Sequence, residues 1–504
     1  MTATTVDEAA PSGFQRAMVL LVLTSTVALY AMTVTIANVS LPQMQGALSA
    51  TQDQIAWVVT FNIVATAVAT PMTGWLTARF GQRRLLLFAV GGFAVASFLC
   101  GAAQSLQMLV LFRIMQGACG APLAPLSQAI VLASYPQRQH GPVTAIFGMG
   151  VVIGPIIAPT LGGYLSEEYG WRWVFYMIVP FAVMSFLGCL AVVREGMKAN
   201  RARLDWTGFL VVSLAVASFQ LMLDRGERES WFESPEIIVE ATLAAVAFYL
   251  AIVHTATHDR PFLNPRLFRD RNFAVGMLLV LIFGMLNFTP MTLLPPMMKA
   301  LQGYPDSVIG ELLALRGAGT LLGFFVMFFA GRIDPRFWLV LGFGLQGVAG
   351  WSMTGFDVTV PFHDVGLASF LQGLGVGFLW VPLTLVTFST LSQDLLADGS
   401  AIFHLLRNLG SSIHISLSVA LVLHTTKVNY GHLTEFITPF TKTLRLPWVV
   451  GRWDPDSVAG LARLGGEIQR QSLMIGYVNA FYLYAVTAFS VLPLIALVRY
   501  RRAR

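Results

Sequence analysis

Four charged or titratable side chains lie inside long apolar runs of the sequence, where they could bind ions or carry protons. Three are arginines, Arg113, Arg316 and Arg407, and the fourth is His404, one helical turn before Arg407. A charge inside a bilayer is costly, so such residues are candidates for function. A guanidinium can hold an anionic substrate or a counter-charge, and an imidazole can gain and lose a proton. For each residue, a structural ion pair or a satisfied polar contact is the alternative.

Further candidates for a substrate cavity or for proton exchange are polar residues within these runs or at their ends. Asn38 and Gln116 lie within runs, where an unpaired amide facing lipid would be costly, so we expect both to point into the bundle. The remaining titratable candidates are Asp53, Asp224, Glu311 and His414, each with an end cap, a surface charge or a satisfied polar residue as the alternative. Aromatic and methionine side chains could line a pocket for hydrophobic compounds or face lipid: Trp57, Phe61, Phe283, Met285, Phe288, Met291, Phe378 and Trp380.

The elements that must position these residues are membrane-spanning helices. Hydrophobic residues make up 56% of the chain and charged residues 12%, with a mean hydropathy of +0.68, which a water-soluble fold could not cover with polar surface. Apolar runs predict about fourteen transmembrane helices, at roughly 17–40, 53–76, 84–103, 106–134, 142–165, 173–193, 207–223, 236–256, 272–296, 307–331, 336–354, 364–391, 398–425 and 473–498. No run alternates in polarity as a barrel strand would, so we expect an all-α integral membrane protein.

Basic residues indicate which side of the membrane each loop occupies. Lys and Arg fall in alternate loops and in the C-terminal tail, whereas the opposite loops are acidic or sparsely charged. The positive-inside rule therefore predicts that the basic loops and both termini are cytoplasmic, and the even helix count agrees. The sequence pI of about 9.3 reflects this topology and contact with anionic lipid, because no module typical of nucleic-acid binding is present.

Several functional classes are excluded by what the sequence lacks. No stretch outside the predicted helices could fold around a phosphate-binding loop, so transport must use an ion gradient or run downhill. No clustered nucleophile, metal-ligand set or carboxylate pair indicates an enzyme, and we expect neither a metal nor a cofactor. The three cysteines lie inside predicted helices without disulfide or metal-ligand spacing.

Two glycine-containing segments have a spacing that suggests moving parts. Between the second and third predicted helices, Gly81 allows a tight turn with φ above zero. Basic residues around it could latch two rocking bundles or merely set topology; the candidate loop residues are Gly74, Arg79, Gly81, Arg83 and Arg84. In the fifth predicted helix, small residues at near-helical spacing let another helix approach closely, either as a sliding seam or as static packing. The residues of this segment are Gly150, Gly154, Pro155, Pro159, Gly162 and Gly163.

These segments together resemble one known family. Segments 35–42, 74–84, 111–117 and 150–163 are similar to four motifs of the fourteen-helix drug:proton antiporters of the major facilitator superfamily, the EmrB/QacA type. The resemblance covers almost the whole chain and implies two six-helix bundles plus two extra helices. Loosely related segments in the two halves, such as 116–127 and 372–384, agree with two similar bundles around a midplane cavity. In this family the counterpart of Arg113 is tied to proton coupling.

The expected organisation follows from the helix pattern and the resemblance. We expect a cytoplasmic tail at 1–16, a six-helix bundle at 17–193, two additional helices within 194–260, a second six-helix bundle at 261–498 and a cytoplasmic tail at 499–504. The second bundle includes a long periplasmic loop at about 425–471, expected to be an ordered or membrane-skimming loop.

The resemblance implies an inner-membrane exporter that exchanges protons for hydrophobic or amphipathic toxic compounds by alternating access. It also implies a periplasmic adaptor protein and an outer-membrane channel as partners, if the source has two membranes. The chain departs from the family where an Asp is frequent, because it has Thr33, Ala78 and Asn479 there, which leaves the proton carrier unidentified. Two alternatives are a dedicated transporter of one polar or anionic metabolite and a non-transporting sensor or scaffold.

Overall fold

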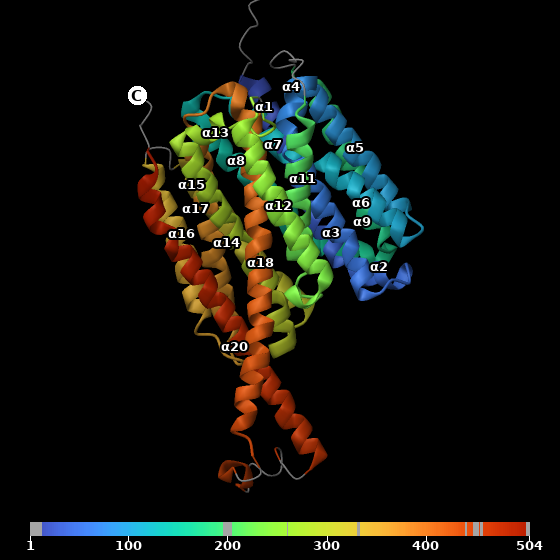
Figure 1. Cartoon of the computed structure of the whole chain (residues 1–504), viewed down its shortest axis with the longest axis vertical. Helices are drawn as coiled ribbons and strands as arrows, with labels where there is room; N and C mark the ends of the chain where they lie inside the picture. Colours follow the sequence, from blue (N-terminus) through green and yellow to red (C-terminus); the bar gives the residue numbers. More distant parts are fainter. Residues whose placement is uncertain are drawn as a thin grey trace, which may run out of the picture.

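The protein is a bundle of long helices. The computed structural model describes residues 13–194, 204–259, 261–329, 333–438, 441–446, 453 and 457–499, and within these ranges the regular structure is entirely helical. The start of α1 (Gly13–Val39) and the residues after η5 (Leu492–Leu497) lie at the same end of the bundle, which we call the terminal end (Figure 1). The opposite end, where α18 and α20 protrude, is called the hairpin end.

The first helices of the chain pack mainly on one another. Helix α1 packs on α8, α3 on α6, and α5 on both α6 and α10, around a core that contains Leu23, Phe93 and Ile178. The elements of this first set are α1, α2 (Leu41–Ala47), α3 (Gln52–Ala69), α4 (Met72–Phe80), α5 (Gln82–Ala102), α6 (Leu106–Gly120), α7 (Leu123–Ser134), η1 (Gln137–Gln139), α8 (His140–Tyr169), α9 (Arg172–Tyr176) and α10 (Ile178–Val192).

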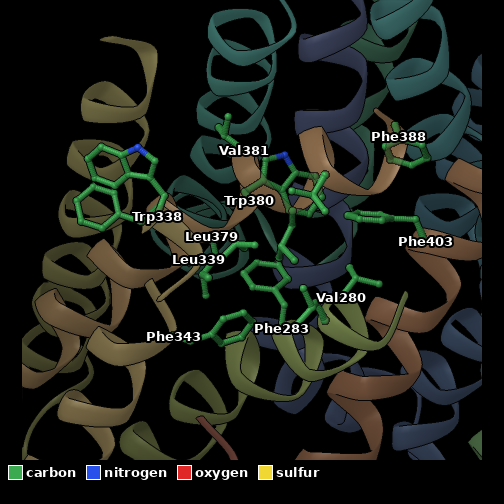
Figure 2. Close-up of a cluster of buried hydrophobic side chains, with 14 of the residues drawn as sticks. Val280, Phe283, Trp338, Leu339, Phe343, Leu379, Trp380, Val381, Phe388 and Phe403 are labelled. Carbon is green, nitrogen blue, oxygen red and sulfur yellow. The ribbon is translucent and has the colours of Figure 1, made fainter. Parts of the chain in front are cut away.

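The last helices form a second set with its own core. Helix α15 packs on α17, α14 on α18, and α16 on both α17 and α20, and their shared core is rich in aromatic residues such as Phe343 and Phe403 (Figure 2). The elements of this second set are α13 (Arg266–Arg269), α14 (Arg271–Gln302), α15 (Asp306–Phe329), α16 (Pro335–Met353), α17 (Phe362–Phe388), η3 (Gln393–Leu395), α18 (Leu396–Glu435) and α20 (Val458–Ser490). Between the sets, α11 (Trp206–Arg225) and α12 (Pro235–Thr257) pack on each other, and α11 contacts α3 and α18 (Figure 1).

Twelve helices of the described part are long and apolar enough to cross a membrane, and a bent pair brings the number to thirteen. The helix predicted over 336–354 is present as α16, but α16 is not among the twelve helices that are long and apolar enough to span a membrane. The bent pair corrects the prediction of one helix over 53–76, because α3 and α4 meet at Pro71 with a bend of 56°. A proline has no N–H to donate to the preceding turn. Pro122 likewise separates α6 from α7, but without a bend of that size, so residues 106–134 remain one span as predicted.

The prediction of a long loop at 425–471 is wrong at both of its ends. Helix α18 continues to Glu435 and α20 begins at Val458, so the two helices run on as a pair that protrudes from the bundle (Figure 1). Hydropathy detects only membrane-spanning lengths, and the polar residues of these extensions carry no such signal although they are helical. We call the protruding pair, residues 425–435 and 458–471, the helical hairpin.

Candidate functional site

A cavity of about 120 Å³ lies between the two helix sets. Its wall comes from α1 and α8 of the first set and from α14, α15, α17 and α18 of the second. Most lining side chains are apolar, including Phe283 and Trp380, whose rings lie 6.0 Å apart (Figure 2). The polar lining residues are Asn287, Arg316, Thr320 and Arg407, so the described part of the cavity wall carries two guanidinium groups and no carboxylate.

Arg316 is buried and held by neutral oxygen and sulfur acceptors. Its Nε donates to Gln372 Oε1 at 2.6 Å, and its Nη2 donates to the carbonyl oxygen and the side-chain oxygen of Asn287 at 2.6 and 3.0 Å. Gln372 accepts at its carbonyl from Gln346, which in turn accepts from the Tyr484 hydroxyl. The guanidinium is therefore fixed at the cavity wall while its charge remains uncompensated by these contacts.

Arg407 faces the same cavity from α18 with fewer partners. Its Nη2 donates to Asn408 Oδ1 at 3.1 Å, and its guanidinium carbon lies 5.5 Å from the centre of the Trp380 ring. Its Nε is buried without a hydrogen-bond partner in the described structure. A ligand with an anionic group could therefore bind between Arg316 and Arg407, with its apolar part against the aromatic wall.

The other predicted cavity residues lie elsewhere. Arg113 is buried within the first set, where it donates to Val58 O at 3.1 Å and to Gln116 Oε1 at 2.6 Å, and neither Arg113 nor Gln116 lines the cavity. Asp224 accepts from the Thr60 hydroxyl and so joins α11 to α3. Asn38 is exposed near the hairpin end of α1, so the prediction that it points into the bundle is wrong; it lies on the face of α1 opposite the buried Ile36 and Ser40, which contact Gly162 and Ser166 of α8.

The aromatic and methionine candidates divide between the cavity and other surfaces. Phe283, Phe288, Met291 and Trp380 line the cavity, which is one of the two alternatives that the sequence left open. The others do not: Trp57 and Phe61 line a shallow hollow near the hairpin end, and Phe378 packs on Trp338 with ring centres 5.1 Å apart.

The loop predicted as a latch lies at the terminal end. Gly81 has φ of +87°, as expected for the turn between α4 and α5. Arg83 donates from Nη2 to the carbonyl of Leu190 at 2.8 Å, so it ties α5 to α10 within the first set, and Arg79 is exposed. Gly74 makes the contact with the second set, because a Cβ added there would overlap the Asp398 carboxylate and lie 3.1 Å from its Cα.

A polar contact deeper in the interface also joins the two sets, and sequence reasoning missed its partner. His404 Nε2 donates to Oε1 of Gln128, on α7, at 2.6 Å, and Ser400 Oγ donates to the same oxygen at 3.3 Å. Gln128 Nε2 donates to Thr384 Oγ1 at 3.5 Å. All four side chains are buried. A glutamine within an apolar run was the available signal, but nothing in the sequence indicates which helix it faces.

The small residues of α8 bring this helix close to α1. A Cβ at Gly150 would overlap the Thr24 side chain, one at Gly154 would overlap the Ala28 carbonyl oxygen, and one at Gly162 would lie 2.6 Å from Ile36 Cγ1. Pro155 lines the cavity, and the side chain of Pro159 lies outside the described part of the structure. Gly163 has nothing within 4 Å, because a helical step of about 100° turns it away from the face that carries Gly162.

A second polar cluster lies at the terminal end, where α11 begins. The Asp205 carboxylate accepts from Gly208 N at 2.9 Å, His254 Nε2 at 2.7 Å and Phe262 N at 3.0 Å. Burial raises the pKa of Asp205, but these hydrogen bonds and the nearby His254 outweigh it and hold the pKa below its ordinary value. Although ligand atoms of Asp205, His254 and His258 lie within 4.8 Å of one another, both carboxylate oxygens are already engaged. We interpret the cluster as a helix cap.

Comparison with known proteins identifies the architecture. The family model described as Major Facilitator Superfamily matches residues 23–414. The chain belongs to this superfamily. It is therefore a multi-pass membrane transporter and not an enzyme, and the family predicted from the sequence motifs is confirmed.

Curated relatives of this facilitator are similar over most of its length. The Multidrug export protein EmrB of Escherichia coli (strain K12) is 35% identical over 81% of this chain and 80% of its own. The EmrB protein of Haemophilus influenzae is 33% identical over 90% of this chain and 89% of its own. The Fatty acid resistance protein FarB of Neisseria gonorrhoeae is 34% identical over 81% of each chain.

Solved structures of other facilitators share the fold. The proton:xylose symporter XylE matches with a TM-score of 0.61 at 12% identity and covers 96% of this chain and 97% of its own. The human organic anion transporter MFSD10 matches with a TM-score of 0.58 at 13% identity and covers 95% of this chain and all of its own. The expected all-α fold of the major facilitator type is thus confirmed.

In this facilitator, replacing Gly154 by alanine should destabilise the protein, whereas replacing Gly163 should not. The added methyl at Gly154 meets backbone atoms, the Ala28 carbonyl carbon at 3.1 Å and Met32 N at 3.3 Å, which cannot rotate away. Overpacking of this kind costs about 1–3 kcal/mol, while Gly to Ala at an open helical position gains about 0.5–1 kcal/mol. Thermal unfolding of the purified variants in one detergent measures the difference. Equal melting temperatures would contradict the close seam.

Proposed function

We propose that the protein is a proton-coupled exporter of hydrophobic or amphipathic toxic compounds that works by alternating access. The bundles 17–193 and 261–498 would rock about the cavity, with 194–260 joining them. The cavity carries this proposal, because its described wall has apolar and aromatic side chains around two guanidinium groups and has no carboxylate. The names of the relatives, multidrug export and fatty acid resistance proteins, support the same class.

The preferred compounds, we infer, are amphipaths that carry an anionic group. Arg316 and Arg407 line the same cavity, and their described partners are neutral. A lipophilic cation would be repelled by both, whereas a carboxylate or sulfonate would form charge-assisted hydrogen bonds. Neutral lipophilic compounds would bind through the aromatic wall alone and more weakly.

The terminal end is proposed to be cytoplasmic and the helical hairpin periplasmic, in an inner membrane. The basic loops, including Arg83, Arg138 and Arg336, support this orientation under the positive-inside rule. The hairpin then reaches beyond the membrane, where a periplasmic adaptor protein could contact it and lead to an outer-membrane channel. Protons would enter from the periplasmic side as compounds leave.

Transport by the reconstituted protein tests the proposal. Proteoliposomes with an imposed proton gradient would be given dodecanoate, a neutral steroid and tetraphenylphosphonium, with and without a protonophore. We expect gradient-driven transport of dodecanoate, weaker transport of the steroid and little of the cation, all abolished by the protonophore. Transport that survives the protonophore, or that takes only the cation, would overturn the proposal.

A dedicated transporter of one anionic metabolite is the second candidate. The two cavity arginines favour it as much as they favour amphipathic anions, but the aromatic wall does not. Competition separates the two functions: several chemically unrelated amphipaths should inhibit dodecanoate transport under the first, and a single polar anion under the second.

A further inference from the structure

The polar contact between α7 and α18 crosses from the first helix set to the second. Residues 128 and 404 are 276 positions apart in the chain, yet their side chains form one of the few hydrogen bonds that bridge the sets in the described structure. Gln128 also engages Ser400 and Thr384, so one amide holds α7 against both α17 and α18. Together with the close approach of Gly74 to Asp398, this contact holds the two sets together on the terminal-end side of the cavity.

The hydrogen bond to Gln128 indicates which ring nitrogen of His404 carries the proton when the imidazole is neutral. The Oε1 atom of Gln128 can only accept, so His404 Nε2 must carry the proton of this 2.6 Å bond. A neutral imidazole then has its lone pair at Nδ1. That atom is buried and has no hydrogen-bond partner in the described structure. His404 is thus a buried base with a free site for one proton.

The charges around His404 make a second positive charge unfavourable there. Arg407, one turn along α18, is the charged residue nearest to it on that helix. Helix α7 has no charged residue. The charged residues of the other helices packed on α18 lie near their ends: Arg79 on α4, Asp224 and Arg225 on α11, Arg271 and Lys299 on α14, and Arg463, Glu467 and Arg470 on α20. On α18 itself, Asp398 lies at the terminal end and His414 lies deeper.

His404 is also close to the cavity. The Trp380 ring, which lines the cavity, lies 6.1 Å from the imidazole, and Arg407 lines the cavity from the same face of α18. The imidazole therefore neighbours Trp380 and, one turn along α18, Arg407, both of which line the cavity. The Trp380 ring lies 6.0 Å from the Phe283 ring and 5.7 Å from the ring of Phe403, the neighbour of His404, between ring centres (Figure 2).

We propose that His404 is the proton carrier of the transport cycle and that its protonation opens the terminal end. A proton from the cavity binds the Nδ1 lone pair and converts the imidazole to an imidazolium. Repulsion by Arg407 and the cost of a buried unpaired charge then separate α18 from α7, and the imidazolium loses its proton to water at the opened cytoplasmic side. This inference rests on the proposed function, and it supplies the group that the missing acids at Thr33, Ala78 and Asn479 leave open.

His414 provides a matched control on the same helix. It is buried as His404 is, but its Nδ1 contacts Thr289 at 2.9 Å and Ser418 at 3.2 Å, both within the second set. Its protonation would disturb that set without acting on the contact between α7 and α18. Comparing variants of the two histidines therefore distinguishes a proton switch at the interface from a general effect of protonating a buried imidazole.

Distances between two spin labels at the terminal end test the proposal without any substrate. The labels are placed through Gln137→Cys and Ser392→Cys, both exposed and on opposite helix sets, after the three native cysteines are changed to alanine. As pH falls from 8 to 5, we expect the distance between the labels to lengthen in the parent protein. In His404→Gln this distance should stay short at every pH. In His414→Gln it should lengthen as it does in the parent. Gln128→Ala, which breaks the contact without removing the base, should be long at every pH.

The outcome is decided by the pH profile. A pH-dependent shift that persists in His404→Gln, or that disappears in His414→Gln, would overturn the proposal, as would short distances in Gln128→Ala at all pH values. Loss of gradient-driven dodecanoate transport by the parent protein, with the label shift intact, would instead refute the proposed function. The two failures are therefore distinguishable.

Discussion

Replacing Arg316 by glutamine should weaken inhibition by an amphipathic anion by about 10- to 150-fold. Inhibition by a neutral amphipath should change less than about threefold. A hydrogen bond to a charged group contributes about 1.5–3 kcal/mol, and 1.4 kcal/mol is tenfold in affinity. The guanidinium faces the cavity and its described partners are neutral, so an incoming carboxylate gains the full charge-assisted bond. The neutral compound makes no such bond.

Inhibition constants for transport in everted vesicles measure this difference, with dodecanoate as the anion and its methyl ester as the neutral analogue. Arg83→Gln is the matched control, because that arginine binds the Leu190 carbonyl at the terminal end and should leave both constants unchanged. If Arg316→Gln weakened both compounds equally, Arg316 would serve the hydrogen-bond network through Gln372 and Gln346 rather than the substrate.

Local chemistry could be predicted from the sequence where it depends on one residue or one helix turn. Gly81 was expected at positive φ and has it, and Arg316 was expected to be buried. Gly150, Gly154 and Gly162 were expected to permit close approach, which the contacts with α1 confirm. Each of these predictions depends on sterics or on the cost of desolvation, which residue type alone determines.

Contacts between distant helices could not be predicted in the same way. Lipid-facing and cavity-facing positions have similar compositions, so Trp380 and Phe378, two residues apart, could not be assigned to the cavity and to helix packing. The partner of His404 lies in another helix set, and no spacing along the chain encodes that pairing. The helical hairpin was missed because hydropathy detects apolar membrane-spanning helices and gives no signal for polar helices outside the membrane.

At the terminal end, α4 of the first set packs closely on α18 of the second set at Gly74. An added side chain there would overlap the carboxylate of Asp398, which could rotate, but it would also lie 3.1 Å from the Asp398 Cα, which belongs to the α18 backbone. The closed terminal end therefore requires glycine at this position, whereas an open terminal end would place no such demand on it.

Gly74→Val should thus lower transport turnover by about 5- to 150-fold, because overpacking of about 1–3 kcal/mol disfavours the closed state by that factor and a cycle of alternating access must pass through it. Gly163→Ala, at a site with open space, is the control and should keep the parent turnover. Initial rates at saturating dodecanoate, compared at equal protein content, measure the effect. The spin-label distances at the terminal end should also be long in Gly74→Val at pH 8, where the parent is short. Normal turnover together with short label distances in Gly74→Val would show that α18 moves near Asp398 to accommodate the larger side chain. Gly74 would then serve only helix packing.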